Sequence, residues 1–148
     1  MANACVLCSA GQEEVVHASE KWRVLLVDDA DYPGFCRVIW NSHVAEMTDL
    51  AETDCTELMR VVWLVESCVR TVMQPDKVNL ASLGNMVPHI HWHIIPRYAN
   101  DRNFPDSIWS AARRDTDGND KVQRMGKVQA LRKTLADTLC GQYGPSRK

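Results

Sequence analysis

A run of seven residues near the middle of the chain reads His89-Ile90-His91-Trp92-His93-Ile94-Ile95, and Pro96 and Arg97 follow it directly. Histidines alternate with bulky apolar residues, a pattern that is typical of a half-buried β-strand. The apolar side chains are expected to face the core. The three imidazoles should then share the opposite face, with roughly 6 to 7 Å between neighbours. Three histidines in line predict a common chemical role, whereas a single one would predict a satisfied core residue.

Two kinds of chemistry use such a row of imidazoles. Neutral imidazole is a common ligand for zinc, and side chains at alternate strand positions can converge on one ion. Alternatively, one histidine is a nucleophile that attacks phosphorus and forms a covalent intermediate. An unperturbed pKa of about 6.5 suits that role, because much of the imidazole is then neutral at physiological pH. The spacing alone leaves both interpretations open.

The run resembles the signature of the histidine triad superfamily, His-x-His-x-His-x-x with hydrophobic x, and Pro96-Arg97 resembles its fragile-histidine-triad branch. Upstream matches keep the family's order: Pro33-Gly34, a strand from Phe35 to Trp40, His43-Val44, and Asp49-Leu50 opening a helix. The matching part covers residues 5–97, and residues 98–148 form a C-terminal extension. The resemblance implies an α+β fold in one domain over residues 1–148, with a mostly antiparallel sheet of about five strands and two main helices.

The resemblance also implies an activity. A family member of this kind is a nucleotidyl hydrolase or transferase that acts at the α-phosphate of a purine nucleotide conjugate. His91 stands at the nucleophile position and would form a nucleotidyl-histidine, His89 would orient it, and His93 would donate to a phosphate oxygen or the leaving group. This path requires no catalytic metal. Dinucleoside polyphosphates and other AMP conjugates both remain candidate substrates.

Further residues match positions around the nucleotide. Asp28 stands where the family holds the ribose hydroxyls, with ordinary turn chemistry as the alternative. Asn79 matches, to within one position, an amide that contacts ribose or phosphate; otherwise it is a polar residue on a solvent face. Gly84 allows close approach to a phosphate, and Asn85 can donate from its amide. Met86 replaces a hydroxyl that relatives often carry, and a thioether cannot relay a proton, which favours polyphosphate over phosphoramidate substrates.

A second hypothesis for the function is a nucleotide-binding regulatory protein with little catalysis. Met86 favours it, and so does the polar stretch Asn41-Ser42, where many relatives are basic. Both hypotheses use the same pocket and differ in whether His91 forms a covalent bond.

The segment Cys5-x-x-Cys8 precedes the first predicted strand. Incidental thiols are one interpretation, and a redox pair would need a neighbouring βαβ unit that the sequence does not predict. A tetrahedral zinc site needs two further ligands. The resemblance supplies them, because some bacterial histidine triad proteins bind zinc at the positions of Cys5, Cys8, His43 and His89. Structural zinc is therefore the candidate cofactor.

Length and composition agree with one soluble domain. The 148 residues are 45% hydrophobic, enough for one sizeable core. No apolar run approaches the roughly 18 residues of a membrane span, and residues 1–12 lack the pattern of a signal peptide, so a cytoplasmic location with reduced thiols is expected. The charges are nearly balanced, with 17 basic and 19 acidic residues, and predict no nucleic-acid polymer as partner. The expected partners are a purine nucleotide and, by resemblance, a second copy in a homodimer.

Periodicity predicts the remaining elements. Residues 15–17, 22–27 and 77–82 alternate as strands do, and residues 54–73 carry an apolar stripe at helical spacing. Asp54 and Glu57 look like a capping pair for that helix. Residues 121–140 form another predicted helix, with Val122 and Met125 on its apolar side. The resemblance suggests that this helix and Trp109 shape the site of the partner subunit.

Overall fold

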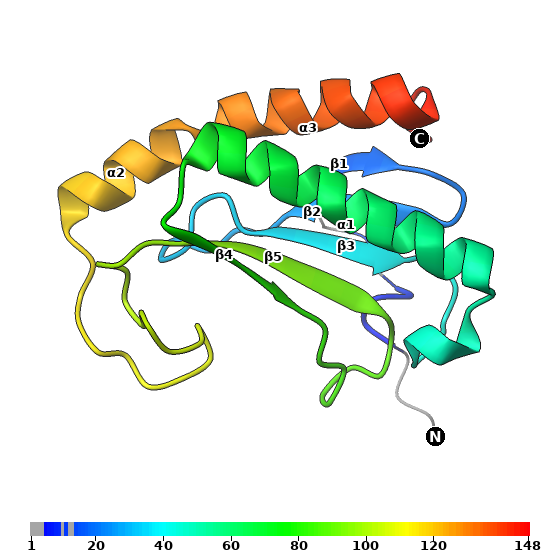
Figure 1. Ribbon diagram of the computed structural model, residues 1–148, viewed down its shortest axis with the longest axis horizontal. Helices are drawn as coiled ribbons and strands as arrows, with labels where there is room; N and C mark the ends of the chain where they lie inside the picture. Colours follow the sequence, from blue (N-terminus) through cyan, green and yellow to red (C-terminus); the bar gives the residue numbers. More distant parts are fainter. Residues whose placement is uncertain (1–4, 10, 12–13) are drawn as a thin grey trace.

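The fold centres on an antiparallel sheet of five strands in the order β1-β2-β3-β5-β4 (Figure 1). The computed structural model describes residues 5–9, 11 and 14–148. The strands are β1 Glu14–Ala18, β2 Trp22–Leu26, β3 Cys36–Trp40, β4 Lys77–Ala81 and β5 His91–Arg97. The expected fold class, an α+β domain with a mostly antiparallel sheet, is confirmed.

Two long helices cover one face of this sheet. Helix α1 (Glu52–Met73) packs across β3 and β5, and helix α3 (Val128–Tyr143) lies beside α1 and over β1 (Figure 1). The short helix α2 (Gly118–Gly126) leads into α3, and a single 3-10 turn, η1 (Met47–Asp49), precedes α1. The opposite face of the sheet therefore stays open to other segments.

The apolar stripe of α1 forms the core with alternate residues of the central strands. Val24, Val38 and Ile94 are fully buried against it. The helical residues buried with them share one side of α1 and are Leu58, Val61, Val62, Val65, Cys68 and Val69. Ile90 and Ile94 face this core as expected, and Trp92 packs against it half-buried. Because alternation places these side chains on one face, the histidines between them point to the other.

Two local predictions about α1 need correction. The helix after Asp49-Leu50 begins only at Glu52, with Ala51 at its N-cap. Asp54 and Glu57 do not cap it, because their carboxylates bind the ammonium of Lys21 at 2.7 and 3.4 Å. Glu57 also accepts from the indole of the buried Trp22 at 2.8 Å. These acids tie the helix start to the hairpin of β1 and β2.

The C-terminal segment forms two helices, where one was expected. Asp117 caps α2 by accepting from the backbone amides of Asn119 and Asp120, and the chain turns at Lys127 before α3. Val122 and Met125, predicted on the apolar side, are exposed. Helix α3 buries its leucines against α1 of its own chain, so its apolar stripe belongs to its own core.

The helices of the described residues show no membrane span. None combines the length and the apolar character that crossing a bilayer requires.

Candidate active site

The central strands β3 and β5 bring two of the three histidines together. In their antiparallel register His93 lies opposite Arg37, and His91 lies opposite Ile39. The rings of His91 and His93 are 4.9 Å apart and meet edge to face. His89 lies just before β5, and its ring packs against that of His43 at 5.2 Å. The row therefore divides into a pair and a single histidine.

A backbone contact determines which nitrogen of His91 carries the proton. Nδ1 of His91 lies 2.6 Å from the carbonyl oxygen of His89. Because a carbonyl oxygen only accepts hydrogen bonds, Nδ1 must donate, and in the neutral ring Nε2 then keeps its lone pair. His91 therefore presents an unprotonated nitrogen, as a nucleophile requires.

His93 lies in a drier setting among aromatic rings. It is buried, with Phe35 at 5.6 Å and Trp109 at 5.1 Å between ring centroids. Burial, followed by the charge of Arg37 and the neighbouring His91, lowers the pKa of His93 to about 4. Nδ1 of His93 is buried without a hydrogen-bond partner. His93 is consequently a neutral imidazole at physiological pH.

The histidine pair opens into a cavity of about 350 Å³, which we call the triad cavity. Its other walls are the segment 83–87 and Trp109. Two predicted substrate residues, Gly84 and Asn85, thus lie beside His91 and His93. Gly84 has φ of 76°, a conformation that glycine adopts without strain. Met86, by contrast, is 96% exposed at the mouth.

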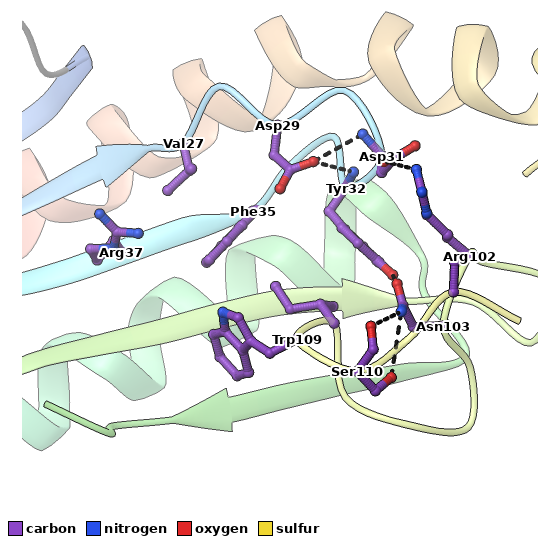
Figure 2. A pocket seen from close by; sticks show the side chains of 12 residues that line it. Val27, Asp29, Asp31, Tyr32, Phe35, Arg37, Arg102, Asn103, Trp109 and Ser110 are labelled. Carbon is purple, nitrogen blue, oxygen red and sulfur yellow. Dashed lines mark hydrogen bonds and ion pairs between the residues drawn. The ribbon is translucent and has the colours of Figure 1, made fainter. Parts of the chain in front are cut away.

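A second cavity, of about 470 Å³, adjoins the first at Trp109, which lines both (Figure 2). It is lined by Asp29, whereas the predicted Asp28 is exposed and is not among the lining residues. One carboxylate oxygen of Asp29 accepts from the backbone amides of Asp31 and Tyr32, at 2.9 and 3.2 Å. The carboxylate of Asp29 thus closes the turn after β2, and the residue that lines the cavity comes one position after the one chosen from the sequence.

Asn79 is not brought to the histidines. It lies on β4, and its amide oxygen accepts from Arg97 at 2.6 Å. It lines a separate cavity of about 630 Å³ along the edge strand, again with Trp109. In this structure Asn79 supports Arg97, one element away from the triad cavity.

A buried ion pair anchors the loop that carries Trp109. The guanidinium of Arg97 donates to both carboxylate oxygens of Asp101, at 2.7 and 3.1 Å, and both side chains are almost fully buried. Arg97 also donates to the Asp106 carbonyl at 2.7 Å. Asp101 accepts from the amides of Asn103 and Phe104 as well. This network fixes the start of the loop.

The loop contributes residues that the sequence did not identify as part of this chain's site. Arg102 reaches Asp31 at 2.9 Å, and Asn103 donates to the Ser110 carbonyl at 3.0 Å (Figure 2). Trp109 lies against the site of its own chain, whereas the family resemblance had suggested that it shapes the site of the partner subunit. Arg37 was also missed, because one arginine in an apolar strand carries no local signal. The position of Arg37 opposite His93 follows from the pairing of β3 with β5, which the sequence does not give.

The predicted metal ligands converge beside the site. Sγ of Cys5 lies 3.4 Å from Nδ1 of His89, and Sγ of Cys8 lies 3.4 Å from Nδ1 of His43 and 3.5 Å from Nδ1 of His89. All four ligand atoms fall within 4.8 Å of one another. A thiolate and an imidazole on one tetrahedral zinc would be about 3.6 Å apart. The set therefore fits a tetrahedral ion.

The protonation of His89 supports the same conclusion. Its Nε2 donates to the carbonyl of Trp40 at 2.5 Å, which leaves the Nδ1 lone pair facing the thiols. Burial is the main cause that lowers the pKa of His89, which favours the neutral ring that metal ligation requires. Cys5, Cys8, His43 and His89 could thus hold zinc.

The chain resembles enzymes that act on dinucleoside tetraphosphates. It is 28% identical over 78 residues to the AP-4-A phosphorylase of Mycobacterium tuberculosis (strain CDC 1551 / Oshkosh), covering 49% of this chain and 40% of that protein. It is 31% identical over 83 residues to the asymmetrical bis(5'-nucleosyl)-tetraphosphatase of Schizosaccharomyces pombe, covering 53% and 46%. The matches thus span less than half the length of either relative.

Solved structures share the fold across most of the chain. A histidine triad protein from Bradyrhizobium japonicum superposes with a TM-score of 0.68 at 28% identity, covering 83% of this chain and 90% of that one. A Zn-bound histidine triad family protein from Mycobacterium smegmatis gives a TM-score of 0.62 at 21% identity, covering 90% and 94%. The HIT domain model matches residues 10–100, and on this match, which agrees with the paired histidines on β5, the chain belongs to the HIT domain family.

Proposed function

We propose that this protein is a nucleotidyl hydrolase or transferase that cleaves a purine nucleotide conjugate at its α-phosphate, through a nucleotidyl-histidine on His91. The observation that carries this proposal is the hydrogen bond from Nδ1 of His91 to the carbonyl of His89, at 2.6 Å. It leaves Nε2 of a half-buried imidazole free to attack, inside a cavity of about 350 Å³. An imidazole so prepared is suited to covalent catalysis.

The proposed reaction proceeds in two displacements. Nε2 of His91 attacks the α-phosphorus, the P–N bond forms, and the bond to the bridging oxygen breaks with its electron pair leaving on that oxygen. The acceptor, water in a hydrolase or phosphate in a phosphorylase, then attacks the same phosphorus and breaks the P–N bond. The acceptor loses its proton to solvent, and His91 returns to its starting state.

The neutral state of His93 bears on the leaving group. With its Nδ1 buried and unpartnered, the proton of the neutral ring is best placed on Nε2, where it can donate to a phosphate oxygen. Since its pKa is about 4, His93 is a poor reservoir of a proton at neutral pH. A polyphosphate leaves as a stable anion and needs none, whereas an amine does. This favours polyphosphates over phosphoramidates.

The cavity of about 470 Å³ that adjoins the triad cavity at Trp109 is the proposed site of the first nucleoside, and we call it the nucleoside cavity. At about 470 Å³ it matches the size of small-molecule sites, and it combines aromatic walls with carboxylates. Asp29, and Asp28 beside it, are the candidates to bind ribose hydroxyls. Arg37 and Arg102 line the same cavity and suit phosphate oxygens. The names of the two curated relatives agree with a dinucleoside tetraphosphate as substrate.

Structural zinc is the proposed cofactor, held by Cys5, Cys8, His43 and His89. The support is the donor set, the S–N separations of 3.4 to 3.5 Å, and the carbonyl of Trp40 behind His89. A zinc ion here would fix the N-terminal segment to the end of β3. His89 then acts on the reaction only by orienting His91.

The rival hypothesis, a regulatory nucleotide-binding protein, loses one of its two supports. The amide of Asn41 donates to the carbonyls of Ser19 and Glu20 at 3.2 and 3.0 Å and accepts from Arg23 at 3.2 Å. These contacts explain Asn41 by a structural role, so its presence says nothing about whether the protein is catalytic. Met86 remains as the feature that favours the rival.

Mass spectrometry of the intact protein separates the two functions. Wild type and His91→Ala are mixed with a panel of dinucleoside polyphosphates and AMP conjugates and quenched without acid, because P–N bonds are acid-labile. We expect a nucleotidyl adduct on wild type alone and consumption of one compound class. Nucleotide binding without adduct or consumption would overturn the catalytic proposal in favour of the regulatory one.

A further inference from the structure

Three exposed apolar side chains surround the mouth of the triad cavity. Trp109 is 51% exposed, Leu83 56% and Met86 96%, and all three line the same cavity as His91 and His93. Large apolar side chains gathered around a site mark a surface that something covers. The proposed nucleotide chemistry at His91 does not by itself explain them.

The Trp109 ring is held in place although half of it is open. One side of the ring packs edge to face against His93, with 5.1 Å between the ring centroids. The neighbouring Ile108 packs on the cluster of Tyr32, Phe35 and Ile95. On the other side Ser110 donates to the Ser107 carbonyl at 2.7 Å and is bonded by Asn103. A fixed, open aromatic face is preorganised for stacking, since little freedom is lost when a ligand covers it.

Trp109 lies where the leaving group of the proposed reaction would pass. It lines both the triad cavity and the nucleoside cavity, so it stands where the two meet. With the first nucleoside in the nucleoside cavity and the α-phosphate at His91, the leaving group must extend along the remaining walls. Those walls are the segment 83–87 and Trp109.

The chemistry of these walls indicates whether the leaving group ends in a phosphate or in a base. The described residues that line the triad cavity include no lysine or arginine, so a bare polyphosphate end meets no cation there. A planar base, in contrast, stacks on an indole and covers aliphatic and thioether groups. We propose that Trp109, Leu83 and Met86 form a stacking site for the second base of a dinucleoside polyphosphate. This inference rests on the proposed function and adds the determinant of its substrate preference.

The test compares two substrates that differ only in the second nucleoside. Di(adenosine-5') tetraphosphate and adenosine 5'-tetraphosphate are cleaved at the same α-phosphate, and kcat/KM is measured for each. For wild type we expect the dinucleotide to be preferred. In Trp109→Ala that preference should fall about tenfold, because the second base loses the aromatic ring on which it stacks. Trp109→Phe, which keeps an aromatic face, should retain most of it.

Controls keep a structural effect apart from a loss of stacking. Val122→Ala removes an exposed apolar side chain of α2 that lines none of these cavities, and should leave both rates unchanged. The double variant Leu83→Ser/Met86→Ser should lower the preference without touching Trp109. If Trp109→Ala slows both substrates by the same factor, or neither, the stacking site is refuted.

Failure of the proposed function gives a different result. If wild type cleaves neither compound, catalysis has failed, and the Kd of each compound is measured by calorimetry. Trp109→Ala should then weaken binding of the dinucleotide about tenfold more than that of adenosine 5'-tetraphosphate. An equal change in both Kd values would overturn the stacking site on its own.

Discussion

The carbonyl oxygen of His89 accepts a hydrogen bond from Nδ1 of His91 at 2.6 Å. The same residue turns its ring toward the thiols of Cys5 and Cys8. His89 therefore contacts the proposed nucleophile His91 through its backbone, and the proposed zinc ligands through its side chain. The two contacts use different atoms of one residue, so metal binding by His89 and nucleophilic attack by His91 are compatible.

We expect His91 to populate the tautomer with the proton on Nδ1. The reason is that only Nδ1 faces the carbonyl acceptor. Long-range proton–nitrogen NMR correlations, with assignments from His91→Gln, report which nitrogen is protonated at pH 8. A proton found on Nε2 would contradict the proposed nucleophile.

Removing one thiol should abolish metal binding. Cys8→Ser is expected to lose the stoichiometric zinc that wild type carries after growth in replete medium, because four ligands close a structural site. Its Tm should fall by at least about 5 °C, since the metal stabilises only the folded chain. The matched control is Cys140→Ser, which removes an exposed thiol of α3 outside the ligand group. Metal analysis showing zinc-free wild type would defeat this prediction.

His93 should titrate far below an ordinary histidine. Its pKa is lowered to about 4, mainly by burial, so the unfolded chain binds the proton more tightly between pH 4 and about 6.5. The contribution of His93 to the free energy of unfolding should accordingly be fully present above pH 6.5. It should decline by about 2 to 3 kcal/mol as the pH falls toward 4. His93→Gln should show a shallower decline, while the buried His17, whose pKa burial also lowers, keeps its own contribution. The imidazole proton resonance of His93 gives the pKa directly, and titration near 6.5 would exclude this account.

The buried pair of Arg97 and Asp101 should be essential for the loop that carries Trp109. Asp101→Asn leaves a buried guanidinium unpaired, and we expect a loss of roughly 3–5 kcal/mol in the free energy of unfolding. The exposed pair of Arg113 and Asp106 provides the comparison, because Arg113→Met should cost at most about 1 kcal/mol. Urea denaturation measures both. Equal effects would show that burial of the first pair confers no special role.

A homodimer through the edge strand β4 is a further prediction. Among the described strands β4 pairs only with β5, and Leu80 on it is 41% exposed. An unpaired edge with apolar side chains is a template for association. Sedimentation should give twice the 16.7 kDa of the chain, and Leu80→Glu should shift the protein toward monomer. A monomeric wild type at micromolar concentration would refute it.

The elements of the sheet and the main helix were predictable because their signals are local. Strict alternation in residues 89–95 and the apolar stripe of 54–73 depend only on the repeat of a strand and of a helix. The start of α1 was not predictable in this way, because Asp54 and Glu57 bind Lys21 and Trp22, which lie far away in the sequence. The split at Lys127 was missed because two successive helices share one periodicity of charges and apolar residues.

The alternating histidines were enough to predict the family, because their spacing is a local pattern, and the family resemblance in turn gave His91 as the predicted nucleophile and Cys5, Cys8, His43 and His89 as the predicted metal ligands. Three other features became visible only in the folded chain: Asp29 lines the nucleoside cavity, Arg37 lies opposite His93, and Trp109 borders the site of its own chain. Those three lie in a turn, a strand register and a loop. Their positions depend on contacts between segments far apart in the chain, and no local repeat encodes such contacts.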